Sequence, residues 1–157
     1  MKNKILSLVL ICALVIGLCS CNAFFGKVED KGDVAIVIEN ADGSYDVFKA
    51  DLENVENKEE GAKGVVEYLG SRKNDKLSYE MTDSTYGAYI SKIGNISEDP
   101  SSGLYVIVYT SNVSDSYEGS PTVDYNGTTL YQAGVGLSGM SVEEGTIILF
   151  RLEKSPY

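Results

Sequence analysis

The sequence predicts an α+β domain: a β-rich sheet of short strands with one packed helix. Several runs rich in β-branched and aromatic residues alternate with turn dipeptides, which is typical of strands joined by short connections. Only one stretch, residues 58–69, has apolar residues at convincing helical spacing. Because this helix accompanies many strands without a βαβ alternation, we expect it to pack on a single sheet.

The first expected element is a hairpin over residues 34–49. Residues 34–38 (VAIVI) form an uninterrupted apolar run, as in a strand that is buried on both faces. A turn sequence, NADG, occupies residues 40–43, and residues 45–49 (YDVFK) return as the second strand.

The expected helix follows a polar, acidic stretch at residues 51–60. It would run from residue 58 to residue 69, and Gly70 is placed to end it. Gly61 and Gly64 lower its propensity, each by about 1 kcal/mol relative to alanine. Four residues would form its apolar face: Ala62, Val65, Val66 and Leu69.

Beyond the helix, the sequence predicts only strands and loops. The Asn126-Gly127 dipeptide is a strong signal for a two-residue hairpin turn between residues 123–125 and 128–131. Residues 99–102 and 112–121 are polar loops. The other expected strands are residues 77–81, 86–93, 104–110 and 146–152.

The N-terminus has the pattern of a bacterial lipoprotein signal. A short basic start precedes an uncharged run from residue 5 to residue 18, the layout of a secretory signal. Residues 18–21 (LCSC) then resemble a lipobox, in which a small residue precedes the cysteine that receives the lipid. We therefore expect lipidation at Cys21 and an extracytoplasmic protein held on the cell membrane by a diacylglycerol anchor.

This interpretation divides the chain into a signal peptide (residues 1–20), a lipidated tether (21–32) and one α+β domain of ligand-binding type (33–157). Three alternatives remain open. A plain signal peptide would need an A-x-A-like cleavage site, and a transmembrane anchor would need about 20 apolar residues. Lipidation at Cys19 would place Leu18 where a small residue is required.

Charge and composition exclude several classes of function. Without residues 1–20, 11 basic residues face 23 acidic ones, and this net charge of −12 argues against nucleic acid or an anionic bilayer surface as the partner. There is no histidine, and Cys21 would be the only cysteine left, blocked by lipid. Histidine triads, thiol nucleophiles and imidazole zinc sites are therefore impossible. Carboxylate pairs and a Ser-Lys pair stay open, but no spacing points to them, so we expect no enzyme activity. The 11 tyrosines are typical of a ligand or protein interface.

Two motifs favour structural interpretations. Residues 134–139 spell G-x-G-x-x-G, but a dinucleotide fingerprint must open a helix, and here another strand follows. We expect these glycines to permit close approach of a ligand or of backbone. The Asp42-Gly43 pair lacks the spacing of an EF-hand and fits a hairpin turn, so no dedicated metal site is expected. Weak calcium binding stays open for five acidic residues: Asp51, Glu53, Glu56, Glu59 and Glu60.

The C-terminal half resembles a known domain. Residues 86–94 (YGAYISKIG) resemble the G-x-Y-I-x-x-I segment of the C-terminal β-domain of transcobalamin and intrinsic factor. Residues 104–105 lie where that family has an aromatic pair, residues 130–136 resemble its L-x-x-G-x-G/S stretch, and residues 142–150 resemble its closing strand. Bacterial surface proteins carry stand-alone versions, and the resemblance implies the same β-rich, β-grasp-like fold over residues 34–152.

The resemblance implies binding of a small molecule, with a corrinoid as the sharpest candidate. In the vitamin carriers this domain forms one wall of a cobalamin cleft, and a helical domain absent from this chain forms the other. Tyr105 replaces the usual Trp, Thr146 replaces the usual Asp, and residues 112–121, with Tyr117, lengthen a loop. The residues expected to line the site are Tyr86, Tyr89, Tyr105, Tyr131, Gly134 and Gly136.

Two other functions stay open at the sequence level. The tyrosine-bearing face could meet another surface protein, as in an adhesion or structural module. The acidic loops could bind calcium or another metal weakly.

Overall fold

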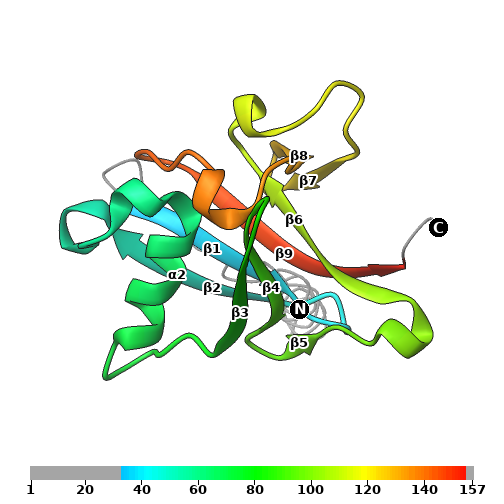
Figure 1. The fold of residues 1–157 in the computed structure, drawn as a ribbon, viewed down its shortest axis with the longest axis horizontal. Coiled ribbons are helices and arrows are strands. Elements are labelled where there is room, and N and C mark those ends of the chain that lie inside the picture. Colours follow the sequence, from blue (N-terminus) through cyan, green and yellow to red (C-terminus); the bar gives the residue numbers. More distant parts are fainter. Residues whose placement is uncertain (1–32, 155–157) are drawn as a thin grey trace, which may run out of the picture.

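The computed structural model describes residues 33–154. Its larger sheet has six strands in the order β2-β1-β9-β6-β8-β7 (Figure 1). Most neighbours are antiparallel, but β1 runs parallel to β9. The strand bounds are β1 Asp33–Glu39, β2 Tyr45–Asp51, β6 Leu104–Thr110, β7 Thr122–Tyr125, β8 Thr128–Gln132 and β9 Ile147–Lys154. The expected hairpins, β1–β2 and β7–β8, are both present.

A second sheet corrects the expectation of a single one. It has three strands, β3 Tyr79–Ser84, β4 Gly87–Ile93 and β5 Ile96–Ser97, in that order. β5 pairs with only two residues of β4 before the chain turns into β6 through a short 3₁₀ helix, η3 (Pro100–Ser102). β4 and β6 therefore come close without forming a ladder. β3 begins at Tyr79 and not at Leu77 as predicted. Leu77 is buried, and its N–H donates to the Leu69 carbonyl of the helix.

The helix α2 spans Gly61–Ser71 and follows a 3₁₀ turn, η2 (Lys58–Glu60); a further turn, η1 (Leu52–Asn54), precedes them. The predicted apolar face is confirmed, because all four of its residues are fully buried. The predicted end at Gly70 is wrong. Gly70 lies inside the helix, where an added Cβ would stand 2.4 Å from Cε1 of the Tyr79 ring.

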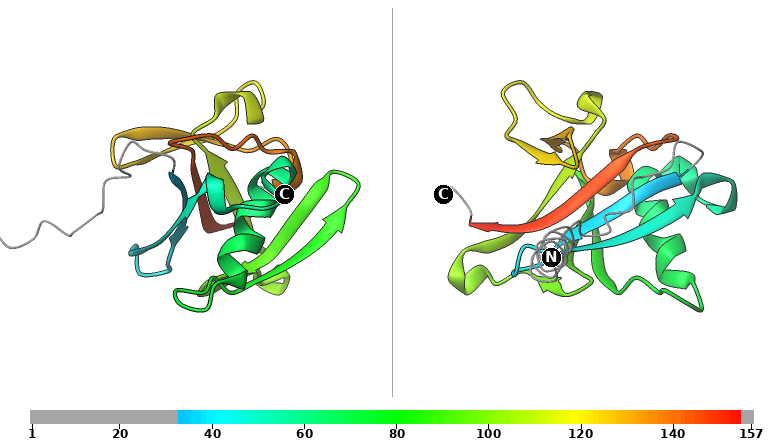
Figure 2. Two further views of the ribbon diagram at one scale, coloured as in Figure 1. Left: turned by 90° about the vertical axis from the view of Figure 1, so that its left-hand side faces the viewer. Right: turned by 180° about the vertical axis from the view of Figure 1, so that it is seen from behind.

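The larger sheet separates two apolar cores. One core lies between this sheet, α2 and β4, which cover the same face (Figures 1 and 2). The other lies on the opposite face, where Tyr109, Leu149 and Ala35 meet Tyr125 and Leu130 of the β7–β8 hairpin. β1 is buried on both faces, which explains its uninterrupted apolar run. Within residues 33–154, no helix is long and apolar enough to cross a membrane.

Candidate functional site

An open slot lies where the two sheets meet, between β4 and β6. Three consecutive residues of each strand line it, Ala88–Ile90 and Val106–Val108, together with residues 132–133 and 135–137. Its volume is about 170 Å³. We call it the β4–β6 slot.

The slot exists because both strands lose their partners there. β8 pairs with β6 only at Tyr109 and Thr110, and β5 pairs with β4 only at Lys92 and Ile93. The first half of β6 therefore has a strand partner only on its β9 side, and the first half of β4 only on its β3 side. These edges are only partly open, because the Leu104 N–H and carbonyl bond Asp99 and the Val108 carbonyl accepts from the Ala133 N–H at 2.9 Å. Main-chain groups that stay unpaired at such an edge can bond an incoming ligand or strand.

Glu98 closes one end of the slot. Its Oε1 accepts hydrogen bonds from the Tyr89 hydroxyl and from the Val106 N–H, at 3.1 Å for the latter. The Glu98 N–H in turn donates to the Ser91 carbonyl of β4, at 2.9 Å. Burial, together with the hydrogen bond to the Glu98 carboxylate, raises the pKa of Tyr89 well above its ordinary value. Tyr89 therefore stays a neutral hydrogen-bond donor.

Residues 134–139, which we call the glycine loop, close the other end of the slot. The Gly136 N–H donates to the Tyr86 carbonyl at 3.1 Å, and the Ala88 N–H donates to Ser138 Oγ at 3.0 Å. A Cβ on Gly136 would stand 2.6 Å from the Tyr86 carbonyl oxygen, so only glycine permits this contact. No helix of more than three residues follows, as expected: residues 137–139 form a 3₁₀ turn, η5 (Leu137–Gly139).

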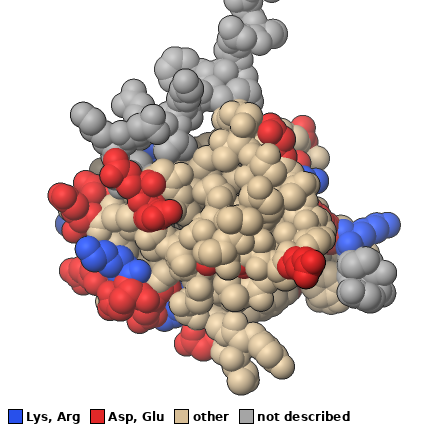
Figure 3. Space-filling model, turned by 90° about the horizontal axis from the view of Figure 1, so that it is seen from above, with Lys and Arg blue, Asp and Glu red and all other residues tan. Residues whose placement is uncertain are grey.

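Several large apolar residues are exposed in the slot and in the loop near it. Tyr86, Tyr89 and Val135 lie in or beside the slot, whereas Val113 and Tyr117 lie in the 112–121 loop. From residue 93 to residue 150 the chain has no lysine or arginine. Seen from above, the molecule shows a broad face on which charged side chains lie mostly at the rim (Figure 3). Clusters of exposed apolar side chains, such as Tyr86, Tyr89 and Val135, mark interaction sites.

Comparison with known proteins finds a distant relationship of fold. No protein-family model matches the sequence, and no curated protein matches it significantly. Among solved structures, a candidate metal-binding protein from Ruminococcus gnavus ATCC 29149 matches with a TM-score of 0.53 and 13% identity, over 80% of this chain and 99% of that one.

A second solved structure, haptocorrin in complex with Cbi, matches with a TM-score of 0.50 and 15% identity. The match covers 78% of this chain but only 25% of haptocorrin. Haptocorrin belongs to the transcobalamin family, so the fold implied by the sequence resemblance is supported at this coarse level.

The structure separates the predicted site residues into two groups. Tyr89 and Gly136 line the β4–β6 slot, and Tyr86, 90% exposed at the tip of the β3–β4 hairpin, lies beside it. Tyr105 is half-buried on β6, one residue before the slot lining. Tyr131 lines a different pocket, beside the 112–121 loop, and Gly134 lies against Tyr117 of that loop.

Several residues of the slot were not predicted. Val106, Ile107 and Val108 read as ordinary strand residues, and Glu98 lies in a polar connection. These residues lie at the slot because β5 and β8 end beside them. Hydrophobic periodicity does not show where the pairing between two strands ends. Val135, by contrast, lies within the glycine motif of residues 134–139, which was expected to allow close approach of a ligand.

Two of the acidic residues considered for calcium have other partners. Asp51 accepts hydrogen bonds from Glu53 N and Asn54 Nδ2, and Glu60 pairs with Lys63. Within residues 33–154, no group of three or more acidic or cysteine side chains is placed to hold a metal ion. Cys21 and the tether lie outside the described residues.

Proposed function

We propose that this chain is a ligand-binding domain that holds a neutral, flat, amide-bearing molecule, of the corrinoid class, against the β4–β6 slot. The observation that carries the proposal is the pair of partly unpaired strand edges beside the exposed rings of Tyr86 and Tyr89. Amide side chains of a ligand can bond the open main-chain groups of β4 and β6, while Tyr86 and Tyr89 supply apolar ring surface.

The fold relationship to haptocorrin supports this choice of ligand class. The size of the slot sets a limit, because about 170 Å³ falls below the roughly 300–1,000 Å³ of pockets that enclose a small molecule. The domain would therefore form one wall of a site. With no histidine in the chain, recognition rests on shape and hydrogen bonds, without an imidazole ligand to cobalt.

Titration calorimetry of residues 22–157 with cobinamide and cobalamin tests this proposal. We expect saturable one-to-one binding, weakened about tenfold in Tyr89→Ala and less in Tyr105→Ala, which lies outside the slot lining. Val47→Ala is the matched control, since Val47 is exposed on β2. No heat and no change in visible absorbance at millimolar corrinoid would rule out this ligand class.

A second candidate is a surface protein-interaction module. The open edge of β6 favours it, because an extended segment of another protein can add to an unpaired strand edge. This function would be favoured over the first if the domain binds no corrinoid but binds a specific protein partner. The substitution Val108→Pro should then abolish binding of that partner.

We further propose that the domain is a lipoprotein on the outer side of the cell membrane, attached through Cys21. The proposal rests on the sequence pattern of residues 1–21. Metabolic labelling with an alkyne fatty acid should mark the membrane fraction of the intact chain, and Cys21→Ala should abolish both the label and the membrane attachment. An unlabelled intact chain would refute lipidation.

A further inference from the structure

A second pocket lies beneath the loop of residues 112–121. Its volume is about 380 Å³, within the ~300–1,000 Å³ range of small-molecule sites. It is built by the loop and by β7 and β8, and it shares no lining residue with the β4–β6 slot. We call it the loop pocket. Its lining residues are Val113, Ser116, Tyr117, Glu118, Gly119, Ser120, Thr122 and Tyr131.

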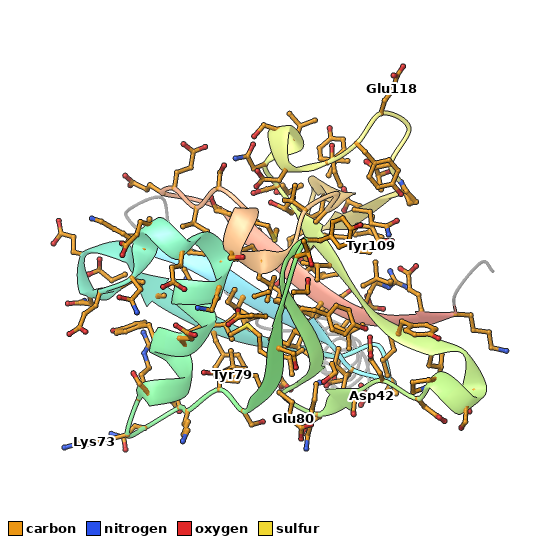
Figure 4. All side chains as sticks on the ribbon, viewed as in Figure 1. Asp42, Lys73, Tyr79, Glu80, Tyr109 and Glu118 are labelled. Atoms are coloured by element: carbon orange, nitrogen blue, oxygen red, sulfur yellow. The ribbon has the colours of Figure 1, made fainter. Side chains whose placement is uncertain are left out.

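The loop is held at both ends. At its start, Asp115 is buried; its Oδ2 accepts from Ser141 N at 2.9 Å, and its carbonyl accepts from Gly134 N at 2.8 Å. At its end, the Pro121 carbonyl accepts from Gln132 N of β8 at 2.9 Å. Figure 4 shows the loop rising above the sheet with Glu118 at its outer end. These bonds form the pocket without any ligand.

Tyr117 is fixed as a platform within the loop. A Cβ on Gly134 would stand 3.2 Å from its Cδ1, so the ring lies close against the glycine backbone. Its hydroxyl donates to Gln132 Oε1 at 3.3 Å. The side chain is nevertheless 48% exposed, which leaves ring surface open to solvent. A ring ordered in advance loses little conformational entropy when a ligand stacks on it.

The chemistry of the lining selects one class of ligand. Two tyrosine rings stand beside the hydroxyl-bearing residues Ser116, Ser120 and Thr122, and Glu118 supplies the one charged group of the lining. A pyranose matches this set, because its flat C–H face packs on an aromatic ring while its hydroxyl groups exchange hydrogen bonds with the side-chain hydroxyl groups. Anionic ligands are disfavoured, since the carboxylate faces no basic residue in the lining.

We propose that the loop pocket is a carbohydrate-binding site for neutral pyranose units of a glycan, with Tyr117 as the stacking platform and Ser116, Ser120 and Thr122 as hydroxyl partners. This site is separate from the corrinoid proposal and does not depend on it.

Titration of residues 22–157 with the methyl glycosides of glucose, galactose and N-acetylglucosamine, followed by backbone NMR, tests the site. At concentrations up to about 20 mM, enough to saturate a millimolar site, we expect shifts of amides in residues 113–122 and 131–134 with at least one sugar. Shifts confined to the β4–β6 slot, or no shifts with any of the three, would overturn the proposal.

Variants separate stacking from a general effect on the fold. Tyr117→Ala should weaken sugar binding about tenfold or more, and Tyr117→Phe, which keeps the ring, should restore it. Tyr89→Ala is the matched control, because it removes a half-exposed tyrosine of the slot; it should lower corrinoid binding and leave sugar binding unchanged. Unaltered sugar affinity in a folded Tyr117→Ala variant would also overturn the proposal.

Discussion

The Glu98 carboxylate joins the two sheets through one oxygen atom. Oε1 takes one hydrogen bond from Tyr89 of β4 and another from the main chain of β6, so it stands where the carbonyl of a neighbouring strand would stand. Hydrogen bonds to a charged acceptor contribute about 1.5–3 kcal/mol each, roughly twice the value of neutral ones. No sequence pattern marks this residue, because both of its donors are brought near only by the tertiary fold.

Buried Tyr109 should make the folded domain less stable at alkaline pH. Its hydroxyl donates to Glu153 Oε1 at 2.8 Å, and burial together with that carboxylate raises the pKa of Tyr109 well above its ordinary value of about 10. The unfolded chain loses this proton near pH 10 while the folded chain keeps it. Stability should therefore be complete below about pH 10 and decline above it.

Urea unfolding at several pH values between about 8 and 11 measures this effect. Tyr109→Phe lacks the titrating group, and its stability should fall less steeply over the same interval. Equal slopes for the two proteins would show that Tyr109 does not carry the pH dependence.

Among the elements, the helix α2 shows most clearly which structural features can be predicted from a sequence pattern. Its apolar face was predicted residue by residue, because burial and helical spacing are local properties. Gly64 was interpreted only as a residue that lowers helix propensity, and Gly70 as the residue that ends the helix. Gly64 lies where a Cβ would stand 2.0 Å from the Asn57 carbonyl oxygen, and Gly70 lies against Tyr79. Close approach between segments is a tertiary requirement, which local propensity cannot report.

Gly64→Ala should therefore destabilise the domain. The substitution gains about 1 kcal/mol of helix propensity, but overpacking against fixed backbone typically costs about 1–3 kcal/mol. We expect a net loss of free energy of unfolding, measured by urea denaturation. Glu67→Ala on the same helix, which removes one partner of Lys63, should change that free energy by less than about 1 kcal/mol. A Gly64→Ala protein more stable than the parent would contradict the packing argument.

For the whole molecule, the sequence predicted the class and most strands but not their division into two sheets. Alternation shows which residues form a strand, and it does not show where a ladder stops. The predicted tyrosines consequently fell into two places: Tyr89 lines the β4–β6 slot, and Tyr131 lines the loop pocket. The resemblance to the transcobalamin β-domain supplied the coarse fold, which the match to haptocorrin supports.

The larger sheet depends on its last strand. β9 lies between β1 and β6 and contributes Ile148, Leu149 and Phe150 to the two cores. A chain that ends at Gly145 should show no cooperative thermal transition by circular dichroism, whereas a chain that ends at Lys154 should melt like the parent. Cooperative melting of the shorter chain would show that the remaining strands form a stable unit by themselves.

This central position of β9 also bears on the order of folding. β9 pairs with β1 from Ala35↔Ile147 onward, and the hairpin β1–β2 has no other neighbour in the larger sheet. Contacts between such distant parts of a chain form slowly. We therefore expect the β1–β9 ladder to close late in folding, so the β1–β2 hairpin joins the rest of the larger sheet only at that late step.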